Sequence, residues 1–374
     1  MEGLTVVSRE RSAGEQMRDE SIVERVVRAT NHVRDALLAG YTTYRDLGSE
    51  AMQNFDAGLR DCVNRGLIPG PRLFVATHAI ASTASYEVRT ENAANGLRVP
   101  QASDAADGID GVRRAVRRRV GDGADVIKFY ADYRRKIMRF PPSQQHPYVG
   151  SIQFPPAEIN PQVLLFSQEE MDMIVQEAKL AGLPVACHAA TARAAAMALK
   201  AGVTSLEHVF ESSDELFEEM ARQGCIYVPT LAVAENLVKD KFPEISAGAK
   251  RAYDLGVRLA AGGDTGTFPH GEGAREMELL IEAGIPVEDV LEACTVGGWE
   301  ACGKDLCGFR FGWFEKGNRA DIIALDADPR VDSHALRKVS FVMKDGRVWK
   351  RDGVAVGMAD GHSWRDSSEP WTHL

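Results

Sequence analysis

Short apolar runs alternate with amphipathic stretches along most of the chain. From Ser21 onward, apolar residues recur with helical spacing as far as Gly40, which predicts a helix that ends there. Ser167 and Glu170 form a capping-box pattern that predicts the start of another helix. Short apolar runs typical of buried strands begin near residues 41, 72, 124, 183, 203, 225 and 257. Strands that alternate with helices of about 10–15 residues predict parallel β–α units.

The number of these units favours one α/β fold over another. Units that recur over this length are typical of a (β/α)8-type TIM barrel more than of a doubly wound sheet, and no glycine-rich phosphate loop follows the first run. We therefore expect a barrel over residues 1–306. Beyond it, strand-like runs separated by Gly, Asn and Asp turns, with a hairpin signal at Lys344–Arg347, predict a small β appendage and tail over residues 307–374.

One segment breaks the alternation of strands and helices. Between Arg134 and Phe166 the chain contains six prolines and little periodicity. Long irregular segments in compact domains are usually lids or binding loops. This one follows a predicted strand, so we expect it beside the carboxyl ends of the strands.

Composition excludes several classes of protein. The chain has 374 residues, 44% of them apolar, and a net charge of −10, which argues against a nucleic-acid or anionic-membrane partner. Neither a signal peptide nor a long apolar run is evident, so we expect a cytoplasmic protein. The six cysteines form no CxxC pair and are interpreted as thiols rather than a disulfide framework.

Polar residues end four of the predicted strands. They are Lys128, His188, His208 and Asp264. The carboxyl ends of parallel barrel strands meet at one mouth, so these distant residues are expected to lie together. Imidazole and carboxylate groups are ligands for zinc and similar divalent ions. The alternative for each histidine alone is a core residue bonded to a backbone carbonyl.

Lys128 needs a specific explanation because it interrupts an apolar strand. A buried ammonium is costly, and burial favours the neutral amine. A neutral amine reacts with carbon dioxide to give a carbamate, which is an anionic metal ligand. The competing interpretation is a salt bridge between Lys128 and Asp264 that holds the mouth together.

The strand-end motifs resemble those of the amidohydrolase superfamily. "VIKF" with Lys128, "VACHAAT" with His188, "SLEHVFE" with His208 and "AAGGDTGTFPHG" with Asp264 follow that superfamily's order and strand positions. The flanking segments Leu37–Gly48 and Phe314–Pro329 resemble the imidazolonepropionase-like and Xaa-Pro-dipeptidase-like branch. The resemblance extends from about residue 22 to about residue 350.

The sequence departs from that superfamily at its N-terminus. The nine histidines include no His-x-His pair, so the expected barrel lacks or replaces its first strand, and the appendage is a partial β-sandwich. The resemblance then implies one divalent ion, Zn²⁺ or a similar metal, held by the Lys128 carbamate, His188 and His208. Asp264 would be the general base or an additional ligand. Alternatively, Met1 is not the true start of a two-metal enzyme.

Other residues near the strand ends are candidates for binding substrate. Tyr130 follows Lys128, His78 ends the strand near residue 72, and His270 lies just past the last strand. For His270 the alternative role is in capping a helix.

The sequence thus predicts a metal-dependent hydrolase that cleaves a carbon–nitrogen bond in an amide, cyclic amide or dipeptide-like small molecule. The alternative is a degenerate barrel, either a pseudo-enzyme or a small-molecule binding protein, that has lost its first metal site. Uncovered strand edges would favour self-association into a homo-oligomer.

Overall fold

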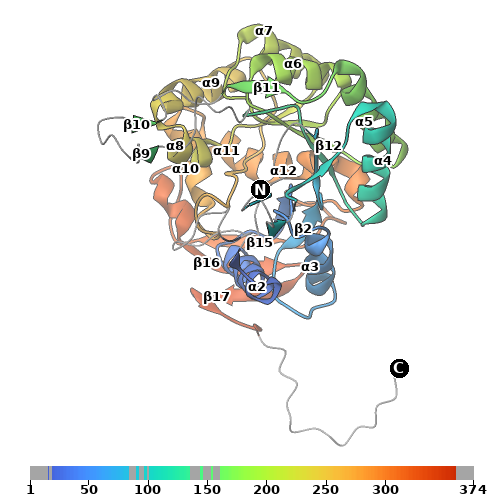
Figure 1. Ribbon diagram of the computed structural model, residues 1–374. Coiled ribbons are helices and arrows are strands. Elements are labelled where there is room, and N and C mark those ends of the chain that lie inside the picture. Colours follow the sequence, from blue (N-terminus) through green and yellow to red (C-terminus); the bar gives the residue numbers. More distant parts are fainter. Residues whose placement is uncertain are drawn as a thin grey trace, which may run out of the picture.

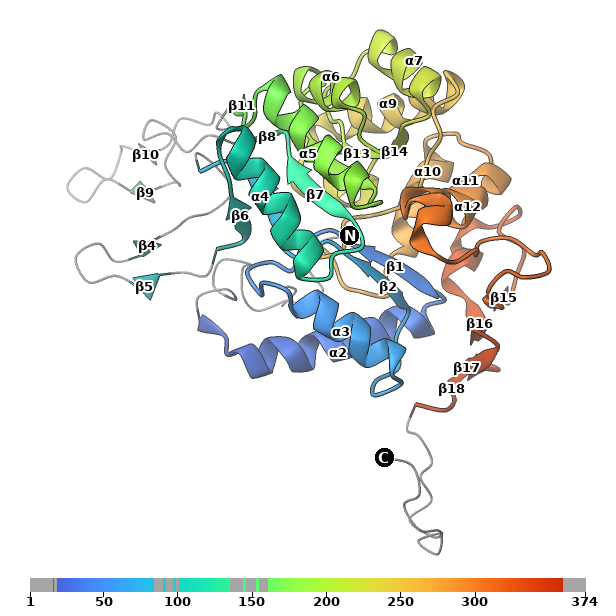
Figure 2. The same ribbon diagram turned by 90° about the vertical axis from the view of Figure 1, so that its right-hand side faces the viewer.

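The computed structural model describes residues 16, 19–83, 101–134 and 161–358, together with the backbone of short strand pieces at 90–91, 97–98, 144–145 and 153–154. Most of the proline-rich segment predicted to be a lid, and residues 359–374, lie outside the described residues. Helices and parallel strands alternate along the chain, and the C-terminal part turns to antiparallel strands (Figures 1 and 2).

The helices are α2 (Ile22–Leu38), α3 (Phe55–Asn64), α4 (Gly108–Gly121), α5 (Gln168–Leu180), α6 (Ala192–Ala201), α7 (Asp214–Gln223), α8 (Leu231–Leu237), α9 (Phe242–Asp254), α10 (Ala274–Glu282), α11 (Val287–Cys294) and α12 (Val296–Ala301). The parallel strands are β1 (Thr43–Asp46), β2 (Arg72–Val75), β3 (Ala79–Ala81), β6 (Ser103–Ala105), β7 (Ile127–Tyr130), β12 (Val185–Ala189), β13 (Ser205–His208) and β14 (Ile226–Val228).

Local sequence signals set three of the helix ends. Helix α2 begins after Ser21, whose hydroxyl accepts a hydrogen bond from the Glu24 amide, and Gly40 follows its end with a left-handed φ of 101°. Helix α5 begins with the reciprocal capping box of Ser167 and Glu170. These end signals confirm that the alternation of elements is encoded locally.

The strands form a curved parallel array. One sheet has the order β14–β13–β12–β7–β3–β6, and β1 pairs with β2, which reaches β7 through a 2.7 Å hydrogen bond from the Asp125 amide to the Val75 carbonyl. The run near residue 257 contributes a parallel bridge between Tyr227 and Leu259. Within the described residues no ladder joins β1 to the segment around Leu259. The parallel α/β prediction is confirmed, and closure into a barrel stays a prediction.

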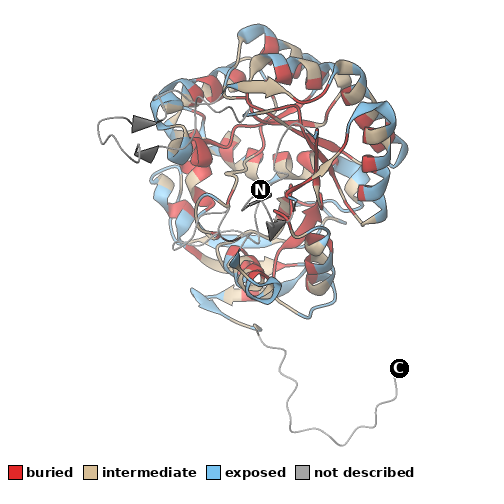
Figure 3. Ribbon diagram, in the orientation of Figure 1, coloured by how far each residue is buried: buried red, intermediate tan, exposed pale blue. Residues whose placement is uncertain are grey.

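The helices cover the outer side of this array. Buried positions of the helices and of the strands face each other between these two layers (Figure 3). Val112 of α4 packs in the same cluster as Phe129 of β7 and Ile174 of α5. In contrast, the strand faces that point away from the helices carry polar residues such as Lys128 and Glu207, both buried. A large apolar core and a buried polar inner face therefore coexist in one sheet.

The C-terminal strands form a separate antiparallel sheet that packs on α2. This sheet has the order β15 (Ile322–Leu325), β16 (Val339–Lys344), β17 (Arg347–Arg351) and β18 (Val354–Ala355). Asp345 and Gly346 have φ values of 52° and 78°, as a type I′ hairpin requires, so the predicted hairpin is confirmed. Leu37 of α2 packs against Val339 of β16 and thereby ties the N-terminal helix to this sheet.

The cysteines agree with a further expectation. All six cysteines lie in the described part of the chain and are free thiols, with Cys187, Cys225 and Cys302 buried. Among the described residues, none of the helices combines the length and the apolar character needed to cross a membrane.

Candidate functional site

Lys128 and His188 point to the same face of the parallel sheet. In the ladder between β7 and β12, Tyr130 is paired with His188, and Lys128 lies two residues before Tyr130. Because side chains alternate along a strand, residues two positions apart share a face. Ile127 and Phe129, on either side of Lys128 in the strand, pack instead in the core shared with the helices. Lys128 and His188 therefore lie on the inner side, opposite to the helix layer.

His208 reaches this side through an unusual backbone conformation. It ends β13 and is paired with Ala189, so regular alternation would direct its side chain away from that of His188. However, its φ of 78° lies in the left-handed region, which is uncommon for a residue other than glycine and changes the direction of the side chain. The ring centroids of His188 and His208 lie 4.5 Å apart, with 63° between the ring planes. Two predicted ligands from neighbouring strands thus meet.

The charge state of His208 follows from its surroundings. Burial, together with the positive charge of nearby Lys128, holds the pKa of His208 well below its ordinary value. The imidazole is therefore neutral at neutral pH and keeps a ring nitrogen lone pair. Lys128 itself is only 1% exposed, and its Nζ lies 5.4 Å from the centroid of the Tyr130 ring. The structure thus brings Lys128, His188 and His208 together.

Aromatic side chains surround the two histidines. The ring centroid of Tyr130 lies 4.7 Å from that of His188, and the centroid of Tyr133 lies 5.7 Å from it. Phe210 approaches His208 with a centroid distance of 5.5 Å. Of the predicted substrate-binding residues, Tyr130 therefore lies directly beside the histidine pair.

A buried carboxylate supports the turn that follows His188. Asp132 accepts hydrogen bonds from the Ala190 and Thr191 amides, both 2.8 Å long, and from the Thr191 hydroxyl at 2.6 Å. Its Oδ1 lies 3.8 Å from His188 Nε2. Burial raises the pKa of Asp132, and the hydrogen bonds from Thr191 and Ala190 oppose that rise. Asp132 thus positions the backbone that follows His188 and the end of β12.

Asp264 lies at the end of the segment that follows Leu259. Its φ of 57° is again left-handed. The carboxylate acts electrostatically on Glu276, whose pKa is raised to about 7, mainly by burial. Among the described residues, no three His, Cys, Asp or Glu side chains lie close enough to hold a metal ion. His188, His208 and Asp264 therefore do not form such a set without a further ligand.

The two remaining residues predicted to bind substrate, His78 and His270, have other neighbours. The charged groups that act on His78 are those of Arg119, Asp104 and Asp122, and burial lowers the pKa of His78. His270 stacks on His32 of helix α2, with a centroid distance of 4.3 Å.

Sequence reasoning missed several polar residues near the histidines. Asp132 and Thr230 each follow an apolar strand at the position that singled out His188, so the same strand-end signal was present for both. Glu276 and Arg45 gave no such signal, because one lies in an amphipathic helix and the other within a short strand.

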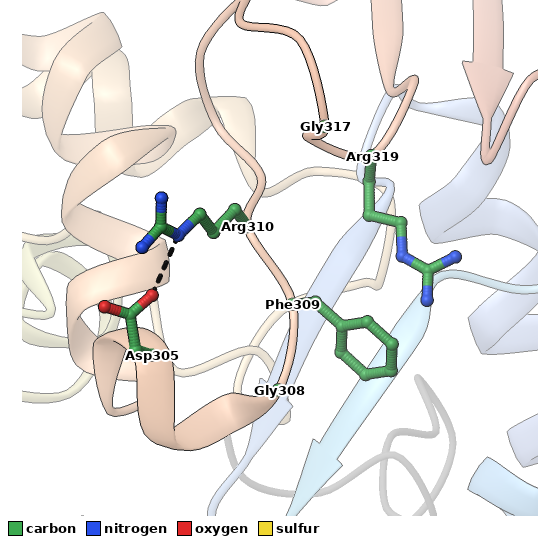
Figure 4. Close-up of a pocket in the computed structure, with 6 residues that line it drawn as sticks. All are labelled: Asp305, Gly308, Phe309, Arg310, Gly317 and Arg319. Carbon is green, nitrogen blue, oxygen red and sulfur yellow. Dashed lines mark hydrogen bonds and ion pairs between the residues drawn. The ribbon is translucent and has the colours of Figure 1, made fainter.

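A surface hollow of about 400 Å³ lies elsewhere on the molecule (Figure 4). In it the Arg319 guanidinium lies 4.3 Å from the centroid of the Phe309 ring, and Arg310 pairs with Asp305 at 2.9 Å. Arg72, the first residue of β2, also lies over the Phe309 ring, at 5.7 Å. The hollow is therefore near the amino end of the strands, whereas the histidines lie at the carboxyl ends. It is not the candidate site.

This chain matches one family model and several known proteins. The model of the Amidohydrolase family matches residues 20–350. Ochratoxinase of Aspergillus niger is 30% identical over 355 residues, which cover 86% of this chain and 68% of that protein. Imidazolonepropionase of Caldanaerobacter subterraneus subsp. tengcongensis is 30% identical over 177 residues, or 45% of this chain and 40% of that protein.

Solved structures agree with the sequence matches. The crystal structure of A. niger ochratoxinase superposes with a TM-score of 0.78 and 26% identity, covering 96% of this chain and 84% of that one. A Xaa-Pro dipeptidase with bound methionine in its active site superposes with a TM-score of 0.73 and 30% identity, covering 88% and 80% of the two chains. The family match over most of the chain confirms the resemblance seen in its motifs, and this chain belongs to the amidohydrolase family.

Proposed function

We propose that this protein is a metal-dependent hydrolase that cleaves a carbon–nitrogen bond in a small dipeptide-like amide. The observation that carries the proposal is the contact between the His188 and His208 rings, next to the buried Lys128. Family membership supports hydrolysis of amide or similar bonds. The relatives matched over most of this chain include an ochratoxinase and a Xaa-Pro dipeptidase, and the name of the second favours a dipeptide-like substrate.

The donor set fits a divalent ion once Lys128 is carboxylated. A neutral His208 offers a lone pair, and His188 lies in ring contact with it. The Lys128 amine would add to carbon dioxide, forming one N–C bond and releasing one proton. The carbamate would supply the anionic oxygen that the two neutral imidazoles lack. Two histidines and a carbamate leave one position open, as a catalytic zinc site requires.

The chain's own residues then have distinct roles. When bound, the ion polarises the scissile carbonyl and lowers the pKa of a water molecule. Asp264 accepts the proton of the attacking water and later returns it to the leaving nitrogen. Tyr130 and Tyr133 flank His188 and keep bulk water from it, which strengthens electrostatic interactions within the site.

A specific observation favours a second candidate function. Among the described residues, His188, His208 and Asp264 do not by themselves form a three-residue metal set. If Lys128 remains an amine, the same group of residues suits a binding protein for small molecules on an amidohydrolase scaffold.

Hydrolysis of a defined panel of amides separates the two functions. The purified chain is incubated with dipeptides, N-acyl amino acids and cyclic amides, before and after chelation and with zinc restored. We expect metal-dependent turnover that Asp264→Asn abolishes. Asp254→Asn is the matched control, because Asp254 pairs with Lys250 at the surface of α9. Binding of an amide without turnover at any zinc concentration would instead support the binding protein.

A further inference from the structure

Thr230 and His208 form a hydrogen bond that determines which nitrogen of the imidazole carries the proton. The His208 Nδ1 atom lies 2.9 Å from the Thr230 hydroxyl oxygen, and both side chains are buried. The Thr230 hydroxyl has a single proton, and it donates that proton to the Pro229 carbonyl at 2.7 Å. Toward His208 the hydroxyl oxygen can then only accept.

We propose that Thr230 is a positioning residue that holds His208 in the tautomer protonated at Nδ1, so that Nε2 presents its lone pair to the site. A histidine that binds a metal usually donates its second ring N–H to a neighbouring acceptor, and that bond fixes both the tautomer and the ring orientation. This inference extends the proposed function by assigning the ligating atom, but the tautomer itself exists whether or not the protein hydrolyses amides.

Glu276 holds Thr230 in the conformation that this bond requires. Thr230 has a φ of 55° and a ψ of 46°, a left-handed conformation that β-branched residues rarely adopt. The Glu276 carboxylate accepts hydrogen bonds from the next two amides, those of Leu231 at 3.0 Å and Ala232 at 2.7 Å. Because both carboxylate oxygens are engaged, the turn at Thr230 is fixed on its C-terminal side.

The backbone of His208 is held by strand β14, which pairs with β13. The Tyr227 hydroxyl donates to the His208 carbonyl at 3.0 Å, and Tyr227 belongs to β14, three residues before Thr230. Strand β14 and Thr230, two residues after its end, therefore support His208 at two points, one on the main chain and one on the ring. The ring cannot rotate without breaking its bond to Thr230.

Nitrogen NMR of the full chain, labelled with 15N-histidine, tests this assignment. The His208 signals are identified by their loss in His208→Asn. We expect a protonated Nδ1 and an unprotonated Nε2 in the wild type at neutral pH without metal. Thr230→Val removes the acceptor and should move the population toward the Nε2-protonated tautomer, whereas Thr230→Ser keeps the hydroxyl and should retain the wild-type pattern. A wild-type ring protonated at Nε2, or an unchanged pattern in Thr230→Val, would overturn the proposal.

Zinc titration followed by calorimetry gives a second, independent readout. Thr230→Val is expected to weaken zinc binding about 10- to 100-fold, and Thr230→Ser to restore it. Equal loss in both variants would show that Thr230 acts only through folding and would overturn the positioning role. Because neither measurement uses substrate, failure of this inference is distinguishable from failure of the hydrolase proposal.

Discussion

Arg45 and Glu207 form a buried ion pair across the inner side of the strand array. The Arg45 Nη2 atom lies 3.0 and 3.1 Å from the two carboxylate oxygens of Glu207, and Nη1 donates to the Ser205 hydroxyl and the Ala301 carbonyl. Arg45 lies on β1 and Glu207 on β13, which are not neighbours in the described ladders. The pair therefore links two separate parts of the array through side chains. Glu207 lies directly before His208 in the sequence.

Removing one partner of this pair should be strongly destabilising. The side chains are only 10% and 3% exposed, so Glu207→Leu leaves a buried charge without its partner and should cost about 3–5 kcal/mol. The double variant Arg45→Met with Glu207→Leu should recover most of that loss. Urea unfolding of the single and double variants measures both values. A double variant no more stable than Glu207→Leu would contradict the account. The exposed pair of Arg222 and Glu219 is the control, and Arg222→Ala is expected to cause no measurable loss of stability.

The sequence predicts local elements and faces better than it predicts partners across the fold. Apolar runs located the strands, and polar residues at their ends singled out Lys128 and His188, because both signals depend on neighbouring residues. The link from Arg45 to Glu207 joins residues far apart in the chain, and no periodic pattern announces it. Likewise, simple alternation would turn His208 away from His188, and only its left-handed backbone brings the rings together.

Gly297 in helix α12 is predicted to tolerate no side chain. A Cβ atom at this position would lie 2.3 Å from the Leu259 carbonyl oxygen, so α12 packs directly on the backbone of the last parallel segment. Gly297→Ala should therefore destabilise the protein by about 1–3 kcal/mol or more. Gly298 is the matched control, because its Cβ would meet nothing within 4 Å. Gly298→Ala should stabilise α12 by about 0.5–1 kcal/mol. Thermal unfolding of both variants tests the contact, and equal effects would refute it.

Asp56 should make stability depend on pH with a sign opposite to that of most carboxylates. Burial raises its pKa to about 7 despite hydrogen bonds from the Thr77 and Ala57 amides. The folded state therefore binds the proton more tightly than the unfolded chain, whose value is near 3.8. The contribution of Asp56 to stability is fully present below pH 3.8 and is lost as the pH rises through about 7.

The comparison with Asp56→Asn isolates this effect from other titrating groups. The stability difference, wild type minus variant, should fall as the pH rises across that window, by at most about 1.4 kcal/mol per pH unit. Denaturant unfolding at several pH values measures it. A difference that stays constant or grows with pH would show that Asp56 is ionised throughout the range.

Asp132 is expected to affect metal binding although it is not one of the predicted metal ligands. It accepts three hydrogen bonds from Ala190 and Thr191, directly after His188. Asp132→Ala removes these acceptors, so we expect about 1–3 kcal/mol of lost stability and a 10- to 100-fold loss of zinc affinity. Asp172→Ala, at an exposed position of α5, is the control. Unfolding and zinc titration together check this, and zinc affinity equal to that of the wild type would limit Asp132 to a role in folding.

Metal content of the Lys128 variant tests the central claim most directly. Wild-type protein, purified in bicarbonate-containing buffer and loaded with zinc, should retain about one equivalent of metal per chain after dialysis. Lys128→Ala should retain far less, and Lys200→Ala, which changes an exposed lysine at the end of α6, should match the wild type. If Lys128→Ala kept the same zinc as the wild type, or if the wild type kept none, a carbamate-assisted metal centre would not be the basis of this protein's function.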